Sequence, residues 1–450
     1  MINLRRAASW IRALPATLSV WADMGWYALH GARRPIRYPR VIHDPRRLLF
    51  LCRSFPPVTD GGVYRAVAIA NAAAEAGWQV TVLAGPVRDP PSAAARELVD
   101  QVAPGVTIAR WAADGRRPMW RVSPHLDGGF TNIRAMIRAA AGIAPPDLVV
   151  ASGPTFSEFV AARVVAAHHG VPYLLDYRDE WTESAFGFVG RGLMDRRWER
   201  FALAGADTVV CTAPSAARHY QRTFGPVIAR PIEVIMNGWD RHPERPHAAD
   251  TAALLRRSIG FYGLLSEEIS RIGFERFADD LERVLALHPE LAGSIRFRFA
   301  GRKSPAYQQR LTTPPLASIC DVVDHLPASE AAAEMRLCRA LLLLNGAGMR
   351  GRIIAGKTFG YIAAGRPILL YGTSGDAADV VMAAGGACPV TPGDPEQLLS
   401  AVVRLMNGEL DAACQMRSAR VVEGHSRAAR TRRYLALFDA IINDRPAETR

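Results

Sequence analysis

The sequence has no run that approaches 18 uninterrupted apolar residues, so we expect no transmembrane helix. Its six cysteines are scattered, and no two lie close enough in sequence to form a metal-ligand pair. We therefore expect buried thiols in a reducing compartment, and neither a disulfide framework nor a zinc site. Lysine is almost absent, because Lys303 and Lys357 are the only two in 450 residues. This arginine bias is typical of GC-rich coding and favours a bacterial source.

The remaining composition is that of a globular protein. The chain is 49% hydrophobic and 22% charged, which excludes a disordered or fibrous protein. Its length predicts two or three domains.

The positive charge is concentrated at the N-terminus. Residues 1–50 contain nine arginines against Asp23 and Asp44, a local +7 out of a net +12. A nucleic-acid binder spreads basic residues along a recognition element. No such element is present, so we expect no nucleic-acid partner.

The basic leader, residues 1–30, has two interpretations. Its apolar residues fall near helical spacing although Pro15 interrupts the pattern, and they include Trp10, Ile11, Leu14, Leu18 and Trp21. The leader either contacts an anionic membrane surface or packs on the protein itself. It lacks the continuous apolar core of a signal peptide, so we expect a cytoplasmic protein, peripheral to the membrane under the first interpretation.

The first half of the chain alternates strands and helices. A strand (46–52), a glycine-containing loop, a helix (63–77) and a strand (79–83) form a βαβ unit, which implies a parallel sheet. Further strands are predicted at 147–151, 173–176, 208–211 and 233–235, with helices at 156–169 and 198–206.

The second half repeats this alternation after a polar segment, 240–251. Its strands are predicted at 259–262, 295–300, 341–344, 368–371 and 388–390. Its helices are predicted at 274–287, 328–337, 355–364 and 395–407. We therefore expect an α/β fold of two doubly wound parallel-sheet domains, facing a cleft at the carboxyl ends of both sheets.

The predicted domain boundaries follow from these patterns. They are an N-terminal extension (1–45), a first domain (46–240), a second domain (241–425), and a C-terminal helix with its tail (426–450).

Three segments carry candidate chemistry, and the first is Asp60-Gly61-Gly62. These residues lie between a strand and a helix, where glycines let a ligand approach the backbone and the helix N-terminus attracts an anion. The alternative is a tight turn without a ligand. The pattern is neither a dinucleotide fingerprint nor a phosphate loop with its lysine.

The second segment is 350–367, RGRIIAGKTFGYIAAGRP. Gly356 and Lys357 open a predicted helix, and Arg350 and Arg352 are close by in sequence. Such a group of cations and backbone N–H groups suits a diphosphate. The alternative is a set of solvated surface charges.

The third segment follows the strand at 173–176 and contains Asp176, Arg178 and Asp179. At the carboxyl end of a parallel strand these groups can hydrogen-bond a polyhydroxylated ligand. The alternative is a structural ion pair of Arg178 with Asp176 or Asp179. Ser152 and Gly153 end a neighbouring strand and form an adjacent loop of the cleft.

Taken in order along residues 48–440, these segments resemble the retaining GT-B glycosyltransferases of the family-4 type. The glycine-loop stretch 54–85 and the stretch 146–181 resemble the acceptor-side domain. The segments FRFAGR and AGKTFGYIAAGRPILL resemble the domain that binds a nucleotide-sugar donor.

This resemblance implies sugar transfer from a nucleotide-sugar to an unidentified acceptor, with retained anomeric configuration and without a bound metal or other cofactor. It implies catalytic roles for Lys357, Arg271 and Asp179. The donor-binding positions that it implies are Gly263, Arg302, Arg350, Arg352, Gly356, Lys357, Thr358 and Gly360. On the acceptor side it points to Asp60, Gly61, Gly62, Ser152, Gly153, Arg178 and Asp179.

Two positions depart from the family pattern. Gly360 stands where the family usually has a glutamate that binds the ribose, and Arg352 stands at an earlier acidic position. The family's acceptor-side histidine is absent as well, since Ser152 and Gly153 occupy that strand end. Two alternatives therefore stay open: a catalytically silent partner of another transferase, and a sugar-nucleotide 2-epimerase. The acid-poor segment 350–367 disfavours the epimerase.

Overall fold

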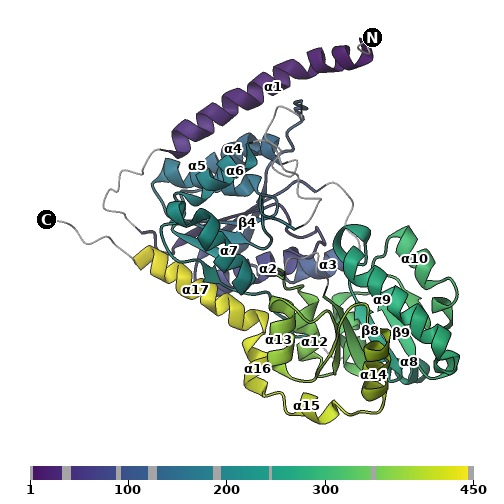
Figure 1. Cartoon of the computed structure of the whole chain (residues 1–450). Coiled ribbons are helices and arrows are strands. Elements are labelled where there is room, and N and C mark those ends of the chain that lie inside the picture. The colour runs from purple at the N-terminus through teal and green to yellow at the C-terminus, as the bar shows by residue number, and fades with distance from the viewer. Residues whose placement is uncertain are drawn as a thin grey trace. The chain divides into compact units, whose positions relative to one another are not determined.

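The structure is a computed structural model, shown in Figure 1. It describes residues 4–32, 42–87, 93–119, 129–185, 194–242, 246–345 and 351–443. Within these ranges the side chains of residues 4–11, 93, 94, 268, 269 and 272 are not described. The chain divides into two compact units, Met1–Ile235 with Thr431–Arg450, and Met236–Arg430.

The first unit is built on a parallel sheet of seven strands in the order β3-β2-β1-β4-β5-β6-β7. The strands are β1 (Arg47–Cys52), β2 (Gln79–Ala84), β3 (Val106–Arg110), β4 (Leu148–Gly153), β5 (Tyr173–Tyr177), β6 (Thr208–Cys211) and β7 (Glu233–Val234). The inner strands β4 and β5 are buried along their whole length. This burial explains their continuous apolar sequences, because helices cover both faces of a parallel sheet.

Helices flank this sheet. They are α1 (Leu4–Gly31), α2 (Val63–Glu75), α3 (Ala93–Asp100), α4 (Ile133–Ala141), α5 (Ser157–His169), α6 (Asp195–Leu203), α7 (Pro214–Phe224) and α17 (Arg427–Asn443), with short 3₁₀ turns at Phe130–Asn132 and Gly225–Val227. The last helix, α17, returns from the second unit and inserts Tyr434 and Phe438 into the core beside Trp78 and Val80. The C-terminal segment thereby completes the core of the first unit.

A buried ion pair holds the first unit together at the carboxyl end of β5. The Arg65 guanidinium on α2 donates to Asp176, with Nη2 and Oδ1 2.9 Å apart. Asp176 also accepts hydrogen bonds from the Ser152 hydroxyl at 2.8 Å and the Tyr434 hydroxyl at 2.7 Å. The Arg65 charge and these hydrogen bonds keep the pKa of the Asp176 carboxyl below its usual value despite its burial. Burying two charges is tolerable because their hydrogen-bonding groups are satisfied by four different elements.

The second unit contains a parallel sheet of six strands in the order β10-β9-β8-β11-β12-β13. The strands are β8 (Ser258–Tyr262), β9 (Arg296–Ala300), β10 (Cys320–Val323), β11 (Ala340–Leu344), β12 (Ile368–Tyr371) and β13 (Ala387–Val390). This order is that of the doubly wound dinucleotide-binding folds.

Nine helices are described in this unit. They are α8 (Ala249–Leu255), α9 (Glu267–Leu287), α10 (Pro305–Leu311), α11 (Ala328–Leu337), α12 (Lys357–Ala363), α13 (Asp376–Ala384), α14 (Pro395–Met406), α15 (Asp411–Gln415) and α16 (Ala419–Gly424), with 3₁₀ turns at Pro289–Gly293 and Leu316–Ser318.

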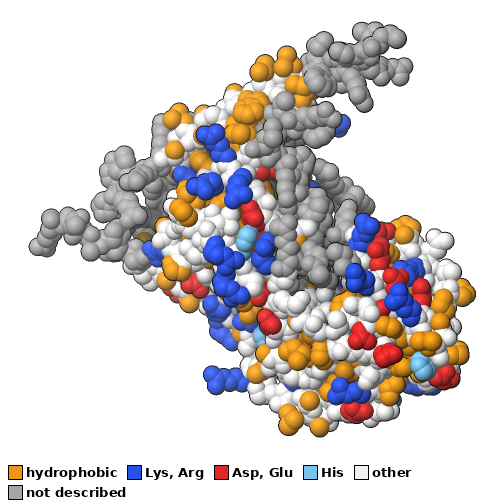
Figure 2. Space-filling view, viewed as in Figure 1, with side chains coloured by type: hydrophobic (Ala, Val, Ile, Leu, Met, Phe, Trp, Pro, Cys, Tyr) orange, Lys and Arg blue, Asp and Glu red, His pale blue; other side chains and the backbone are white. Residues whose placement is uncertain are grey.

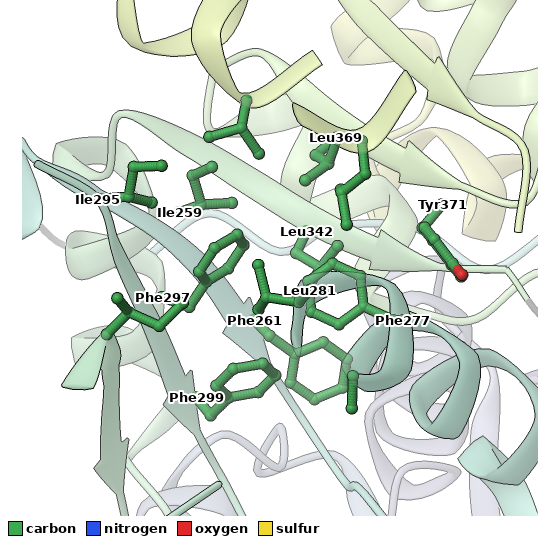
Figure 3. Packing of buried hydrophobic residues seen from close by; sticks show 14 of the residues in the cluster. Ile259, Phe261, Phe277, Leu281, Ile295, Phe297, Phe299, Leu342, Leu369 and Tyr371 are labelled. Atoms are coloured by element: carbon green, nitrogen blue, oxygen red, sulfur yellow. The ribbon is translucent and has the colours of Figure 1, made fainter. Parts of the chain in front are cut away.

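An aromatic core lies between this sheet and α9, as Figure 3 shows. Phe277 on α9 meets Phe297 edge to face, with ring centroids 5.5 Å apart. Phe261 and Phe299 lie on neighbouring strands with centroids 5.7 Å apart. The core thus fixes the end of β8, from which the next loop departs.

The prediction of two doubly wound parallel-sheet domains is confirmed, and so is each of the eleven predicted strands. Two edge strands, β3 and β10, were not predicted. Edge strands are half solvated, so their sequences lack the apolar run that marks a central strand. Thr107 and Ile108 on β3 are exposed, and all four residues of β10 are only partly buried. None of the helices in the described ranges combines the length and hydrophobicity of a membrane span.

Candidate functional site

The strand order of the second unit reverses between β8 and β11. The loop after β8 and the chain after β11 therefore diverge from the same point at the carboxyl edge of the sheet, where open α/β sheets bind ligands. The loop 263–266 leads into α9, and the chain beyond β11 enters α12 at Lys357. We take this edge as the donor-side candidate site.

Lys357 occupies this point. Its ammonium nitrogen lies over the Phe261 ring, 3.6 Å from the centroid. A Cβ placed on Gly263 would lie 3.2 Å from the same nitrogen, so the glycine leaves the space that the ammonium fills. Burial lowers the pKa of Lys357 to about 7, although the residue as a whole is partly exposed. Among the described residues, no carboxylate or carbonyl oxygen pairs with this nitrogen.

The other lysine, Lys303, is a cation whose hydrogen bonds are satisfied within the fold. Its ammonium donates to three backbone oxygens, those of Gly301 at 2.5 Å, Val323 at 2.6 Å and Phe299 at 3.2 Å. Lys303 therefore joins the ends of β9 and β10, whereas Lys357 is left with an aromatic face as its partner.

Two glycines bring the neighbouring loops together. Gly263 has φ +139° and Gly301 has φ +127°, conformations that glycine adopts without strain. A Cβ on Gly301 would lie 2.2 Å from the carbonyl oxygen of Gly263. Arg302 follows Gly301 and its carbonyl accepts a hydrogen bond from the Leu265 N–H at 2.9 Å. The structure thus places Gly263, Arg302 and Lys357 at the same edge of the sheet.

The remaining predicted donor positions lie on α12 or just before it in sequence. Gly356 is exposed and precedes the helix, while Thr358 is fully buried. The Thr358 hydroxyl has no hydrogen-bond partner within the described part of the chain. Arg352 is partly buried, and Arg350 lies outside the described residues.

Gly360 lies in the interior of α12 with open space around it. A Cβ built there meets no atom within 4 Å. The position can therefore accept a larger side chain, and the glycine is not required by packing.

The contacts of Arg271 do not include Lys357 among the described residues. It is on α9, its side chain is 71% exposed, and its Nε lies 3.7 Å from the Glu275 carboxylate. No contact in the described residues joins Arg271 to Lys357, so its catalytic role stays a prediction.

The described residues contain no group of three or more His, Cys, Asp or Glu side chains that could hold a metal ion.

The acceptor-side candidate site lies at the corresponding edge of the first unit, where the order reverses between β1 and β4. The Arg178 guanidinium lies directly over Gly62, since a Cβ on this glycine would fall 1.1 Å from its Nη1. Its Nε donates to the Gly153 carbonyl at 3.2 Å, and its Nη2 donates to the Pro154 carbonyl. Arg178 therefore links the glycine loop to the end of β4.

Asp60 is used within this loop. Its carboxylate accepts the Gly62 N–H at 3.0 Å and the Ser54 hydroxyl. Gly61, in contrast, has open space around its Cα. The loop is thus a turn ordered by its own carboxylate, with Gly61 facing outward.

Asp176 is not available to a ligand as the sequence suggested. It pairs with Arg65 and not with Arg178, and it is fully buried together with Ser152. This partner could not be predicted from local spacing, because Arg65 lies 111 positions away. Asp179 next to Arg178 remains partly exposed, and its pKa is raised by burial, an effect that the Arg178 charge opposes.

Two buried carboxylates near this edge were not among the predicted site residues. Glu158 accepts from the Thr155 hydroxyl at 2.7 Å and the Ser157 hydroxyl at 2.9 Å, and burial raises its pKa. The spacing Thr-x-x-Glu at a helix start could have identified it. Glu199 accepts from Tyr220 at 2.8 Å, and burial raises its pKa to about 7.

Comparison with known proteins finds a family that part of the chain matches. Residues 60–238 match the family described as glycosyl transferase 4-like domain. Among curated proteins, no sequence matches the chain significantly.

Solved structures match both units. Sucrose-phosphate synthase from Thermosynechococcus elongatus matches with a TM-score of 0.65 at 14% identity, over 88% of this chain and 99% of that chain. Anabaena HepE in complex with UDP and glucose matches with a TM-score of 0.61 at 15% identity, over 88% and 100%. A putative UDP-N-acetylglucosamine 2-epimerase from Listeria monocytogenes matches with a TM-score of 0.56 at 11% identity, over 89% and 97%.

The protein thus has the GT-B fold, with two Rossmann-like units. Residues 60–238 match the glycosyl transferase 4-like family model, and the resemblance read from the sequence is confirmed at this level.

The contact between Arg178 and Gly62 predicts a difference between adjacent glycines. Gly62→Ala should displace the guanidinium from the Gly153 and Pro154 carbonyls and cost about 1–3 kcal/mol. Gly61→Ala should be neutral or slightly stabilising, because its Cβ meets open space. Calorimetric melting of both variants checks this, and Gly62→Ala should lose its cost in an Arg178→Ala background. Equal melting temperatures for the two single variants would contradict the contact.

The open space at Gly360 predicts a stabilising substitution. Gly360→Ala should stabilise the second unit by about 0.5–1 kcal/mol, because alanine is the better helix former and meets no atom. The melting temperature measures this, and a decrease would show that the position is more crowded than it is in this structure.

Proposed function

We propose that the protein transfers a sugar from a nucleotide-sugar donor to an acceptor hydroxyl, with retention of the anomeric configuration and without a metal. The second unit binds the donor, and the first unit contributes the acceptor side. The glycosyl transferase 4-like domain and the GT-B fold support the class of reaction. HepE, which shares the fold, is described in complex with UDP and glucose.

The observation that carries this proposal is the environment of Lys357. A buried ammonium without a carboxylate costs free energy unless an anion neutralises it. Here the nitrogen faces a glycine loop at the strand-order reversal of a dinucleotide-binding sheet. A nucleoside diphosphate supplies the missing negative charge, and the loop glycines allow its close approach.

The proposed chemistry follows from this placement. The bond between the anomeric carbon and the diphosphate breaks, and the acceptor oxygen forms a new bond on the same face of the sugar. Lys357 stabilises the charge that develops on the leaving diphosphate. The acceptor's proton passes to a phosphate oxygen, so no side-chain base is required.

The other predicted residues take supporting roles. Arg302 and Gly356 lie at the donor edge with Lys357, and Thr358 is buried within α12 next to it. For Arg350 and Arg352 the proposal rests on their place in the sequence. Arg271 reaches the phosphate only by leaving Glu275, which an exposed side chain does at little cost. Asp179 is the partly exposed carboxyl on the acceptor side, next to Arg178.

Gly360 supports a second candidate function. With no side chain at this position, the helix has no carboxylate to bind a ribose there. Either the space admits a bulkier donor, or the protein is a catalytically silent partner of another transferase. An epimerase has a similar fold, but the acid-poor segment 350–367 disfavours this third possibility.

We place the reaction in a reducing compartment, the cytoplasm. All six cysteines are free thiols in the structure, and five of them are buried. Burial raises the pKa of the Cys52 and Cys211 thiols, which keeps them protonated and unreactive.

A thermal-shift panel of UDP, GDP, ADP, dTDP and CDP tests the proposal. One nucleotide at about 100 times its Kd should stabilise the parent protein by about 2.7 kcal/mol. Lys357→Ala should abolish this shift, and Lys357→Arg should retain part of it, because the charge remains while its geometry changes.

The same panel distinguishes the alternatives. No shift in the parent protein, with a shift restored in Gly360→Glu, would contradict the transferase and support the silent partner. If a nucleotide binds, turnover of its sugar conjugate without any acceptor would instead indicate the epimerase.

A further inference from the structure

Helix α1 precedes the first strand of the sheet and docks on the first unit through one face. It packs along α5 and buries Val20, Met24 and Tyr27, which lie three or four residues apart. Pro15 lies inside the helix without ending it.

Polar contacts fix the same face. The Thr17 hydroxyl accepts the Met119 N–H at 2.8 Å, and Arg116 donates to Asp23 at 2.5 Å. At the end of the helix, Arg163 donates to the Gly31 carbonyl at 2.8 Å. These contacts of the described residues hold the helix on the protein through its docked face.

The opposite side of α1 is apolar and exposed, and Figure 2 shows hydrophobic side chains along this helix. At 100° per residue, Leu14, Leu18 and Leu29 fall within an arc of roughly 60°, about 140° from the docked face. Leu18 is 60% exposed and Leu29 is 62% exposed. Trp21 and Trp26 border these leucines on either side, with 41% and 43% of their surface exposed. We call these five residues the leucine–tryptophan stripe.

The sequence around the stripe is strongly basic. Residues 1–43 contain seven arginines and one acidic residue, Asp23. The arginines stand on both sides of the stripe in sequence, at positions 5, 6 and 12 before it and 33, 34, 37 and 40 after it. Asp23 is neutralised on the docked face by Arg116, with Arg134 3.6 Å away. In sequence, the segment that contains the stripe therefore carries a net positive charge.

We propose that the leucine–tryptophan stripe binds the surface of an anionic phospholipid bilayer, with α1 lying in the plane of the interface. Leucines enter the acyl boundary, indoles occupy the headgroup level, and arginines attract the anionic lipid. This charge distribution favours a lipid surface over a second copy of the chain, which would bring two equally basic segments together. The stripe belongs to the first unit and the donor site to the second, and the proposal does not depend on the proposed reaction.

Vesicle co-sedimentation of the full chain tests the proposal. The parent protein should bind mixed phosphatidylglycerol–phosphatidylcholine vesicles, bind pure phosphatidylcholine vesicles more weakly, and lose affinity as salt is added. The double variant Leu18→Gln/Leu29→Gln should bind the mixed vesicles at least about tenfold more weakly, because two leucines no longer enter the acyl boundary.

Leu287→Gln is the matched control, since Leu287 is 70% exposed at the end of α9 in the second unit. It should bind the mixed vesicles like the parent. All three proteins should melt at the same temperature, because none of these leucines is buried. Undiminished vesicle binding by the double variant would overturn the proposal. So would a parent protein that ignores vesicles but forms a dimer in analytical ultracentrifugation that the double variant does not form.

Discussion

The reversal of strand order in each parallel sheet decides where ligand-facing groups collect. In the second unit the chain leaves β8 and β11 in opposite directions, which opens the carboxyl edge between them. Gly263 follows the first of these strands, and Lys357 begins the helix that follows the second. In the first unit the corresponding edge holds the Asp60–Gly62 loop and the end of β4, which Arg178 joins. The two units therefore present comparable edges with different chemistry.

The two lysines differ in their partners, and this difference marks the donor edge as a candidate binding site. The Lys303 ammonium donates hydrogen bonds to three backbone oxygens and stabilises the sheet. Burial lowers the pKa of both lysines, but the partner of the Lys357 ammonium among the described residues is the Phe261 ring, so Lys357 can gain an anionic partner. A structural cation would be expected to resemble Lys303. The first unit shows the complementary case in Arg65 and Asp176, a buried pair that is already complete and therefore serves the fold.

The sequence was sufficient for the fold because central strands of a parallel sheet are buried on both faces and appear as continuous apolar runs. It missed β3 and β10, whose half-solvated positions leave no such run. It placed Gly356 and Lys357 correctly at a helix start, since glycine is a common N-cap residue. It did not identify Arg65 as the partner of Asp176, because local spacing carries no information about a contact between distant segments. The exposed face of α1 could be predicted only in part from the sequence. Leu14, Leu18 and Trp21 show a helical pattern, but the pattern does not tell which side of the helix docks on the protein.

Isothermal titration at pH 8 with the best-stabilising nucleoside diphosphate, in buffers of different ionisation enthalpy, tests the central claim most directly. With a pKa of about 7, Lys357 is mostly neutral at pH 8 in the free protein and becomes charged when a diphosphate binds. The account predicts the uptake of a large part of one proton per nucleotide bound. It also predicts no uptake in Lys357→Arg, whose guanidinium stays charged throughout. Equal nucleotide affinity of the parent protein and Lys357→Ala would contradict a role for Lys357 as the cation that neutralises the diphosphate. Binding without proton uptake would contradict the lowered pKa of Lys357.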